Sequence, residues 1–120
     1  MRGFASTALL AFTIAASGAL AEETTLDHQA ILDTLTGAVV EGSGWSQTFD
    51  RGGATAFISQ GKTSTGRWDV EGDQYCSTWP PSDQWSCYRV ASSVDGSVTT
   101  IIWISADGSR ESARLLAKGK

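Results

Sequence analysis

Residues 75–90 read YCSTWPPSDQWSCYRV and contain both cysteines of the chain, both prolines and two of its five tryptophans. Direct pairing of Cys76 with Cys87 across an antiparallel hairpin would place Tyr75 opposite Tyr88. A disulfide between the two cysteines would close a short loop and stabilise the domain by about 3 kcal/mol in the chain-entropy model. The stretch therefore predicts a β-hairpin clamped by a disulfide.

Side chains alternate between the two faces of such a hairpin. The face with two tyrosines and a valine is the better candidate for the interior, and it carries Tyr75, Ser77, Tyr88 and Val90. The opposite face carries Gln74, the disulfide, Trp85 and Arg89.

The tip of the hairpin is the run WPPSDQW, residues 79–85. Its two prolines stiffen the loop and cannot donate ladder hydrogen bonds, and Ser82 and Asp83 supply turn chemistry. A stiff loop framed by aromatic rings suits recognition, although the two indoles could equally pack over the end of the fold. The candidate binding residues are Trp79, Asp83, Trp85 and Arg89.

The chain before the hairpin begins with a helical pattern. Apolar side chains recur at helical spacing from Thr24 to Leu35, with Thr24 as the N-cap candidate and Gly37 as the stop. After Gly37 the sequence changes to short runs rich in Val, Thr, Trp, Phe and Ile, separated by glycines. The expected strands are Ala38–Glu41, Trp45–Phe49, Ala54–Ser59, Thr65–Glu71, Gln74–Trp79, Trp85–Ser92, Val98–Ser105 and Arg110–Leu116.

Tight turns connect these runs, because Asp-Gly pairs stand at 95–96 and at 107–108. About eight short strands cannot hide their edges in one flat sheet. We therefore expect a mainly β fold, either a small antiparallel meander barrel or a strongly curled sheet, preceded by one short helix. The expected interior residues are Trp68, Val70, Tyr75, Tyr88, Val90, Ile102 and Ile104, joined by Phe49 and Phe57.

The first 21 residues carry one arginine, an apolar stretch and the small-residue triplet Ala19-Leu20-Ala21. This pattern is typical of a secretory signal peptide cleaved after Ala21. A retained membrane anchor is less favoured, since the apolar stretch is shorter than the roughly 20 residues that a spanning helix needs. We expect residues 22–120 to form one periplasmic or secreted domain without a membrane span.

Composition excludes several classes of partner. The chain has 13 acidic and 9 basic residues, a formal charge of −4, and no basic stripe that could neutralise nucleic-acid phosphates. Two cysteines and the single His28 fall short of the four ligands of a structural zinc site. We expect no nucleic acid, no metal and no cofactor.

Catalytic motifs are also missing. The only histidine, His28, lies in the expected helix, where the neighbouring Asp27 faces elsewhere. Gly61-Lys62-Thr63 lacks the first glycine of a phosphate-binding loop. The carboxylates from Asp69 to Asp83 alternate along strands or lie in turns, which is typical of solvated surface. We assign no catalytic residue and expect a protein that is not an enzyme.

Several motifs occur together along the chain: Leu35-Thr36-Gly37, Phe49 to Gly53, Gly66-Arg67-Trp68-Asp69-Val70, Tyr75-Cys76 with Trp79, and Cys87-Tyr88-Arg89-Val90. In this order they resemble a family of small exported bacterial proteins known only as a domain of unknown function. The resemblance implies an N-terminal helix and a small disulfide-bonded β-barrel, and it brings no activity. Residues 51–55 (RGGAT) depart from it where many relatives have Asp-Gly-Thr.

Two hypotheses of function follow from these features. The first is an exported, non-enzymatic binding module that holds a protein or a small ligand through the loops of a small β-barrel. The alternative is a proteinaceous inhibitor of a basic exported or host enzyme such as lysozyme, since an acidic inhibitor would complement a basic target.

Overall fold

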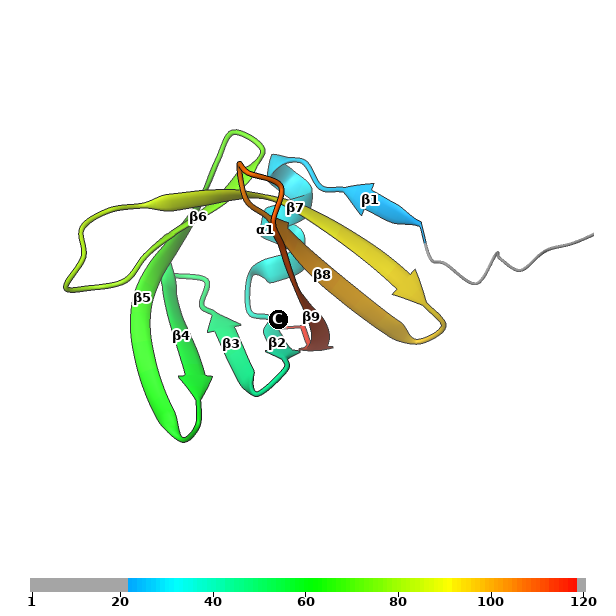
Figure 1. The fold of residues 1–120 in the computed structure, drawn as a ribbon. Coiled ribbons are helices and arrows are strands. Elements are labelled where there is room, and N and C mark those ends of the chain that lie inside the picture. The colour runs from blue at the N-terminus through cyan, green and yellow to red at the C-terminus, as the bar shows by residue number, and fades with distance from the viewer. Residues whose placement is uncertain (1–21, 119–120) are drawn as a thin grey trace, which may run out of the picture.

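The computed structural model describes residues 22–118, so the expected signal peptide lies outside the described residues. These residues form one helix, α1 (His28–Leu35), and nine strands (Figure 1). The strands are β1 (Glu23–Thr25), β2 (Val39–Gly42), β3 (Trp45–Phe49), β4 (Ala54–Ser59), β5 (Lys62–Glu71), β6 (Gln74–Thr78), β7 (Ser86–Asp95), β8 (Val98–Ile104) and β9 (Arg110–Ala117).

Strands β2 to β9 form a closed antiparallel barrel in which each strand pairs with its neighbours in sequence. The circle closes because β9 pairs with β2 as well as with β8. The remaining strand, β1, pairs with the second half of β7, whose first half pairs with β6. The expectation of a mainly β meander is confirmed, and of its two forms the barrel is the one observed.

All eight expected strands are present, and β3 and β4 have the expected bounds. The expected start of the helix at Thr24 is wrong, because Glu23–Thr25 pairs with β7 as β1. The N-cap is Asp27, whose carboxylate accepts a hydrogen bond of 2.9 Å from the Ala30 amide.

The disulfide between Cys76 and Cys87 is present, and the two cysteines are direct partners in the β6–β7 ladder. Tyr75 lies opposite Tyr88, as expected, and Ser77 lies opposite Ser86. The ladder consists of these three pairs. β6 ends at Thr78 and β7 begins at Ser86, so Trp79 and Trp85, which were expected to be strand residues, belong to the connecting loop.

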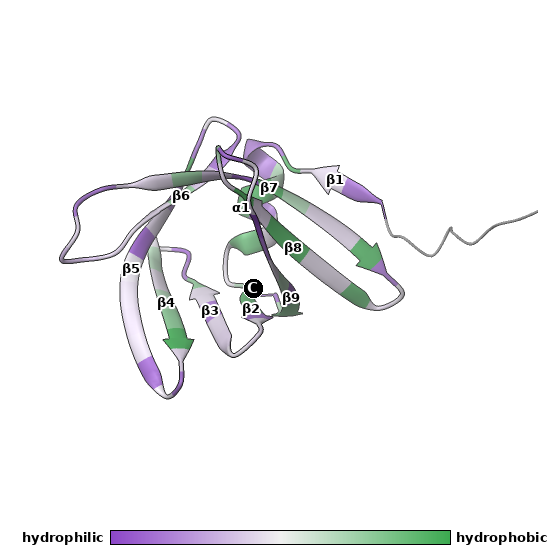
Figure 2. Ribbon diagram, viewed as in Figure 1, coloured by the Kyte–Doolittle hydropathy of each residue, from purple (hydrophilic) through white to green (hydrophobic). Residues whose placement is uncertain are grey.

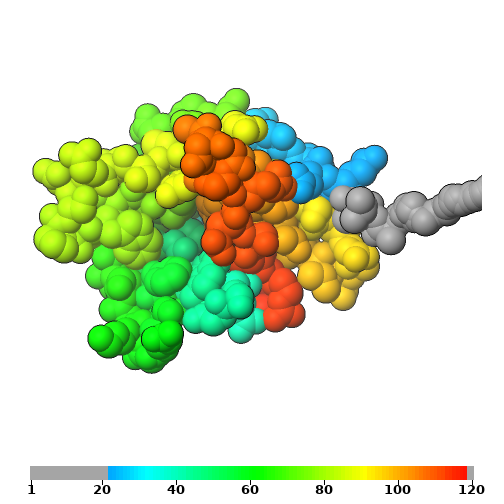
Figure 3. Space-filling model, in the orientation of Figure 1, coloured from blue at the N-terminus to red at the C-terminus, as the bar shows by residue number. Residues whose placement is uncertain are grey.

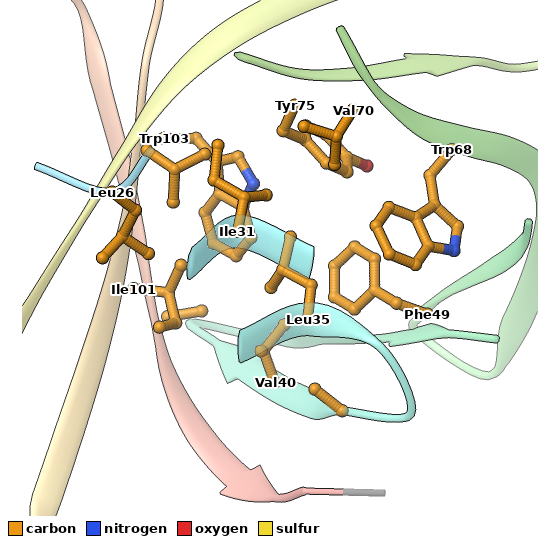
Figure 4. Packing of buried hydrophobic residues seen from close by; sticks show 13 residues of the cluster. Leu26, Ile31, Leu35, Val40, Phe49, Trp68, Val70, Tyr75, Ile101 and Trp103 are labelled. Carbon is orange, nitrogen blue, oxygen red and sulfur yellow. The ribbon is translucent and has the colours of Figure 1, made fainter. Parts of the chain in front are cut away.

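The core lies inside the barrel around the apolar face of α1. Ile31 and Leu35 of α1 are fully buried and point among side chains from the surrounding strands (Figure 4). The strand residues of this cluster include Val40, Phe49, Trp68, Val70, Tyr75, Val90, Ile101, Trp103 and Ala113. Figure 2 shows hydrophobic bands on β8 and a mainly hydrophilic β6–β7 connection, in line with this arrangement.

The expected placement of Ile102 and Ile104 in the barrel interior is wrong. Val90, which is interior, pairs with Trp103, so the indole of Trp103 takes the inner face of β8. Ile102 and Ile104 are buried on the other face, in a small cluster with Ala91. Both faces of β8 are apolar, and the register with β7 decides which one points inward.

None of the helical structure in residues 22–118 has the length and apolar character that a membrane-crossing helix requires.

Candidate functional site

The inward positions of the strands change character from one end of the barrel to the other. Near α1 they are filled by the buried core. Two or four residues further along the strands, the inward positions are polar or only half-buried, as in the series from Phe49 through Gln47 to Trp45 on β3. The helix fills one end, and the opposite end holds a cavity of about 800 Å³.

The cavity is lined by residues from β3 to β9 and from the β8–β9 connection. These residues are Trp45, Gln47, Phe57, Ser64, Tyr75, Ser77, Trp79, Tyr88, Trp103, Ser105, Ser109, Arg110 and Glu111. Aromatic rings and hydroxyl groups dominate this set. Cavities of this size and character are the usual form of small-molecule sites.

Three half-buried rings form the outer aromatic cluster, which consists of Trp45, Phe57 and Trp79. Trp45 stacks on Phe57 with centroids 5.2 Å apart, and Phe57 meets Trp79 edge-to-face at 6.3 Å. The indole Nε1 of Trp79 donates a hydrogen bond of 3.2 Å to the Ser77 hydroxyl. This bond and the ring contacts hold Trp79 in the cavity wall.

Three more rings form the inner aromatic cluster, which consists of Tyr75, Tyr88 and Trp103. The Tyr75 ring lies 6.3 Å from that of Tyr88 and 6.2 Å from that of Trp103, centroid to centroid. Tyr75 and Trp103 also belong to the core, so the inner cluster forms the boundary between core and cavity.

A buried polar network lies beside the inner cluster. The Gln47 side-chain amide donates to the Thr55 hydroxyl at 2.9 Å and to the Tyr75 hydroxyl at 3.3 Å. Burial raises the pKa of Tyr75, although its side-chain hydrogen bonds with Ser77 and Gln47 act in the opposite direction. Tyr75 is therefore neutral at physiological pH and can both donate and accept a hydrogen bond.

The Trp103 indole nitrogen is buried and has no hydrogen-bond partner among residues 22–118. A buried donor without an acceptor costs about 1–3 kcal/mol. Such groups are rare in folded proteins, so each one marks a point of structural or functional interest. Trp103 belongs both to the core and to the lining of the cavity.

Two charged residues line the cavity at the start of β9. The Arg110 guanidinium forms an ion pair with the Glu23 carboxylate of β1. Glu111 pairs with Trp103 across the β8–β9 ladder and faces the same side of the sheet as the buried Ala113. Within residues 22–118, no hydrogen bond or ion pair involves the Glu111 side chain.

The expected binding residues of the hairpin tip do not lie together. Trp79 turns into the cavity, whereas Trp85 lies outside it with 48% of its surface exposed. Trp85 lines a second, smaller hollow of about 370 Å³ with residues of α1, β5 and the β3–β4 turn. Asp83 and Arg89 are exposed and line neither hollow. Figure 3 shows the β6–β7 connection as a lobe that projects from the body of the molecule.

His28 lies at the end of the barrel opposite the cavity, where it forms hydrogen bonds with the β5–β6 turn. Its backbone amide donates a hydrogen bond of 2.8 Å to the Asp73 carboxylate, and its Nδ1 lies 2.6 Å from the Gly72 carbonyl oxygen. It therefore anchors the start of α1 to the β5–β6 turn. No group of three or more His, Cys, Asp or Glu within residues 22–118 is arranged to hold a metal ion.

Four cavity residues in particular were not predicted from the sequence: Trp45, Gln47, Ser64 and Glu111. A signal for them exists in the sequence. On β3 and β5 the residues on the inner face become polar or small toward one end, for example from Trp68 through Gly66 to Ser64. Such a gradient predicts an interior that is filled at one end and open at the other.

No family model matches the chain, and neither the curated proteins nor the solved structures contain a significant match to it. The resemblance to a family of exported proteins accordingly stays a prediction.

Proposed function

We propose that this protein is an exported, non-enzymatic binding protein that holds a small molecule in the open end of its barrel. The observation that carries the proposal is the cavity of about 800 Å³, which has aromatic walls and a few convergent polar groups. Small β-barrels are known to enclose single small ligands in this position.

The nature of the walls supports a ligand inside the barrel. Interior positions that only had to stabilise the fold would be filled by apolar side chains, as they are near α1. Toward the open end they carry instead Gln47, Ser64 and Ser77 between aromatic rings.

Binding rather than catalysis is supported by the chemistry of the lining. The hydroxyls of Ser64, Ser77 and Ser105 are not accompanied by a histidine, since His28 lies at the β5–β6 turn. Export is supported by the signal-like residues 1–21 and by the Cys76–Cys87 disulfide, since disulfides persist in oxidising compartments.

The test uses two tryptophan substitutions at neighbouring positions of β5. Ser64→Trp fills the cavity, because Ser64 lines it. Thr63→Trp is the matched control, because Thr63 does not line the cavity and alternation turns it to the opposite face of β5. Wild type and both variants are dialysed against the small-molecule fraction of the cells that make the protein, and retained compounds are identified by mass spectrometry.

We expect wild type and Thr63→Trp to retain the same compound, and Ser64→Trp to retain at least tenfold less of it. Equal retention by Ser64→Trp would place the ligand elsewhere on the protein. Absence of any retained compound from wild type would contradict the proposed function.

A further inference from the structure

The cavity is rich in aromatic rings and poor in positive charge. Six rings line it, in the outer cluster of Trp45, Phe57 and Trp79 and in the inner cluster of Tyr75, Tyr88 and Trp103. The face of an aromatic ring carries partial negative charge, which attracts cations that have shed their water.

The formal charges around the cavity also favour a cationic ligand. Arg110 is the one cation among the lining residues, and its guanidinium is engaged by the Glu23 carboxylate. Glu111 is the one anion, and its carboxylate has no partner within residues 22–118. The lining therefore presents one uncompensated negative charge, in a chain whose net charge is already −4.

We propose that the ligand of the barrel is an organic cation with a methylated or otherwise alkylated ammonium group. This inference rests on the proposed function and specifies the ligand class of the same site. The alkylated ammonium packs among the aromatic rings, and Glu111 at the start of β9 supplies the counter-charge.

Other ligand classes fit the lining less well. An anionic ligand would meet the Glu111 carboxylate and the ring faces, and it would have to compete with Glu23 for the Arg110 guanidinium. A small inorganic cation would lose its water without receiving the oxygen ligands that it requires, because the lining contributes a single carboxylate. An alkylated ammonium is weakly hydrated and matches apolar walls as well as charge.

The test compares choline with dimethylbutanol, the neutral alcohol in which a carbon atom replaces the choline nitrogen. The two molecules have nearly the same shape, so a difference in affinity reports charge. Binding is measured by isothermal titration calorimetry on wild type, Glu111→Gln, Glu71→Gln and Ser64→Trp. Glu71→Gln is the matched control, because Glu71 is an exposed carboxylate that lies outside the cavity.

We expect choline to bind wild type at least tenfold more tightly than dimethylbutanol. Glu111→Gln should weaken choline binding about fivefold without changing that of the alcohol, and Glu71→Gln should leave both unchanged. Ser64→Trp should abolish choline binding, because it fills the cavity.

Three results would overturn the inference. If the alcohol binds as tightly as choline, the cavity does not select charge, although the proposed binding function stands. If choline binding survives in Ser64→Trp, the cation binds outside the barrel. If neither molecule binds, the cation class is wrong, and the dialysis experiment decides separately whether the barrel holds another ligand.

Discussion

The indole ring of Trp79 lies directly over Gly66 of β5. A Cβ atom added at Gly66 would come within 2.8 Å of the indole Cε3 and within 2.4 Å of the Thr78 carbonyl oxygen. The missing side chain at Gly66 thus allows the first residue of the hairpin tip to fold into the barrel. The same contact removes Trp79 from the exposed tip and makes it part of the cavity wall.

Gly66→Ala should therefore destabilise the protein by about 1–3 kcal/mol, the usual cost of overpacking. Gly52→Ala is the control, because nothing lies within 4 Å of a Cβ at that position and its backbone is not in the left-handed region. In urea denaturation, Gly66→Ala should lower the midpoint, whereas Gly52→Ala should change the free energy of unfolding by no more than about 0.5 kcal/mol. Equal effects would mean that Trp79 does not occupy this place.

The disulfide should contribute strongly to stability, because it joins β6 to β7 across a loop with a sequence separation of 11. Replacing Cys76 and Cys87 together by alanine should lower the free energy of unfolding by about 3 kcal/mol. Mass spectrometry of the wild-type protein should show the loss of two hydrogens relative to the dithiol. Stability of the double variant within about 1 kcal/mol of wild type would contradict this role.

Stability should fall at high pH because of Tyr75. Burial raises the pKa of Tyr75 above its ordinary value of 10.0, so the folded protein holds this proton more tightly than the unfolded chain does. The resulting stabilisation is complete below pH 10 and is lost as the pH rises from there through the folded-state pKa. Thermal unfolding of wild type and Tyr75→Phe between pH 8 and pH 12 checks this, and the variant should lose less stability. Parallel curves would contradict the assignment.

Trp85 should contribute little to folding, in contrast to Trp68. The Trp68 side chain is 6% exposed and donates its Nε1–H to the Asp50 carbonyl oxygen at 2.9 Å. Trp68→Ala should cost about 3–5 kcal/mol, whereas Trp85→Ala should cost less than about 1 kcal/mol. Chemical denaturation of the two variants provides the comparison. A severely destabilised Trp85→Ala protein would show that the tip only packs.

Once its stability is known, Trp85→Ala also tests the inhibitor hypothesis. The retention of Trp85→Ala and of Asp83→Ala on an immobilised lysozyme column can be compared with that of wild type. Salt-sensitive retention of wild type that both variants lose would favour an inhibitor that uses the tip. Passage of wild type without retention would remove lysozyme as the target.

The sequence was sufficient to predict the antiparallel β meander, because turn signals such as Asp95-Gly96 and the alternation of each strand act locally. It left open a barrel or a curled sheet, because closure depends on the pairing of β2 with β9, which are distant in sequence. The disulfide followed from the position of Cys76 and Cys87 in one hairpin. The start of the helix was predicted wrongly because Glu23–Thr25 pairs with β7, a contact between segments distant in sequence. Local helical spacing carries no information on such a contact.

The placement of Trp103 could have been predicted from the register of β7 with β8. The interior Val90 was predicted, and a two-residue turn after Asp95 pairs Val90 with Trp103. That register would have moved Ile102 and Ile104 to the outer face. The cavity depends on many such registers together, since its lining comes from β3 to β9 and the β8–β9 connection, and no single stretch of sequence reveals it.

If the barrel holds its ligand in the open end, as we propose, the five tryptophans report on binding there. Trp45, Trp79 and Trp103 line the cavity, whereas Trp68 and Trp85 lie outside it. The indole N–H signals of ¹⁵N-labelled protein are followed by NMR while the small-molecule fraction is added. We predict that the signals of Trp45 and Trp79 shift most, that Trp103 follows, and that Trp85 does not move. A shift of Trp85 with Trp45 and Trp79 unchanged would contradict binding in the open end, because the ligand would then bind outside the barrel.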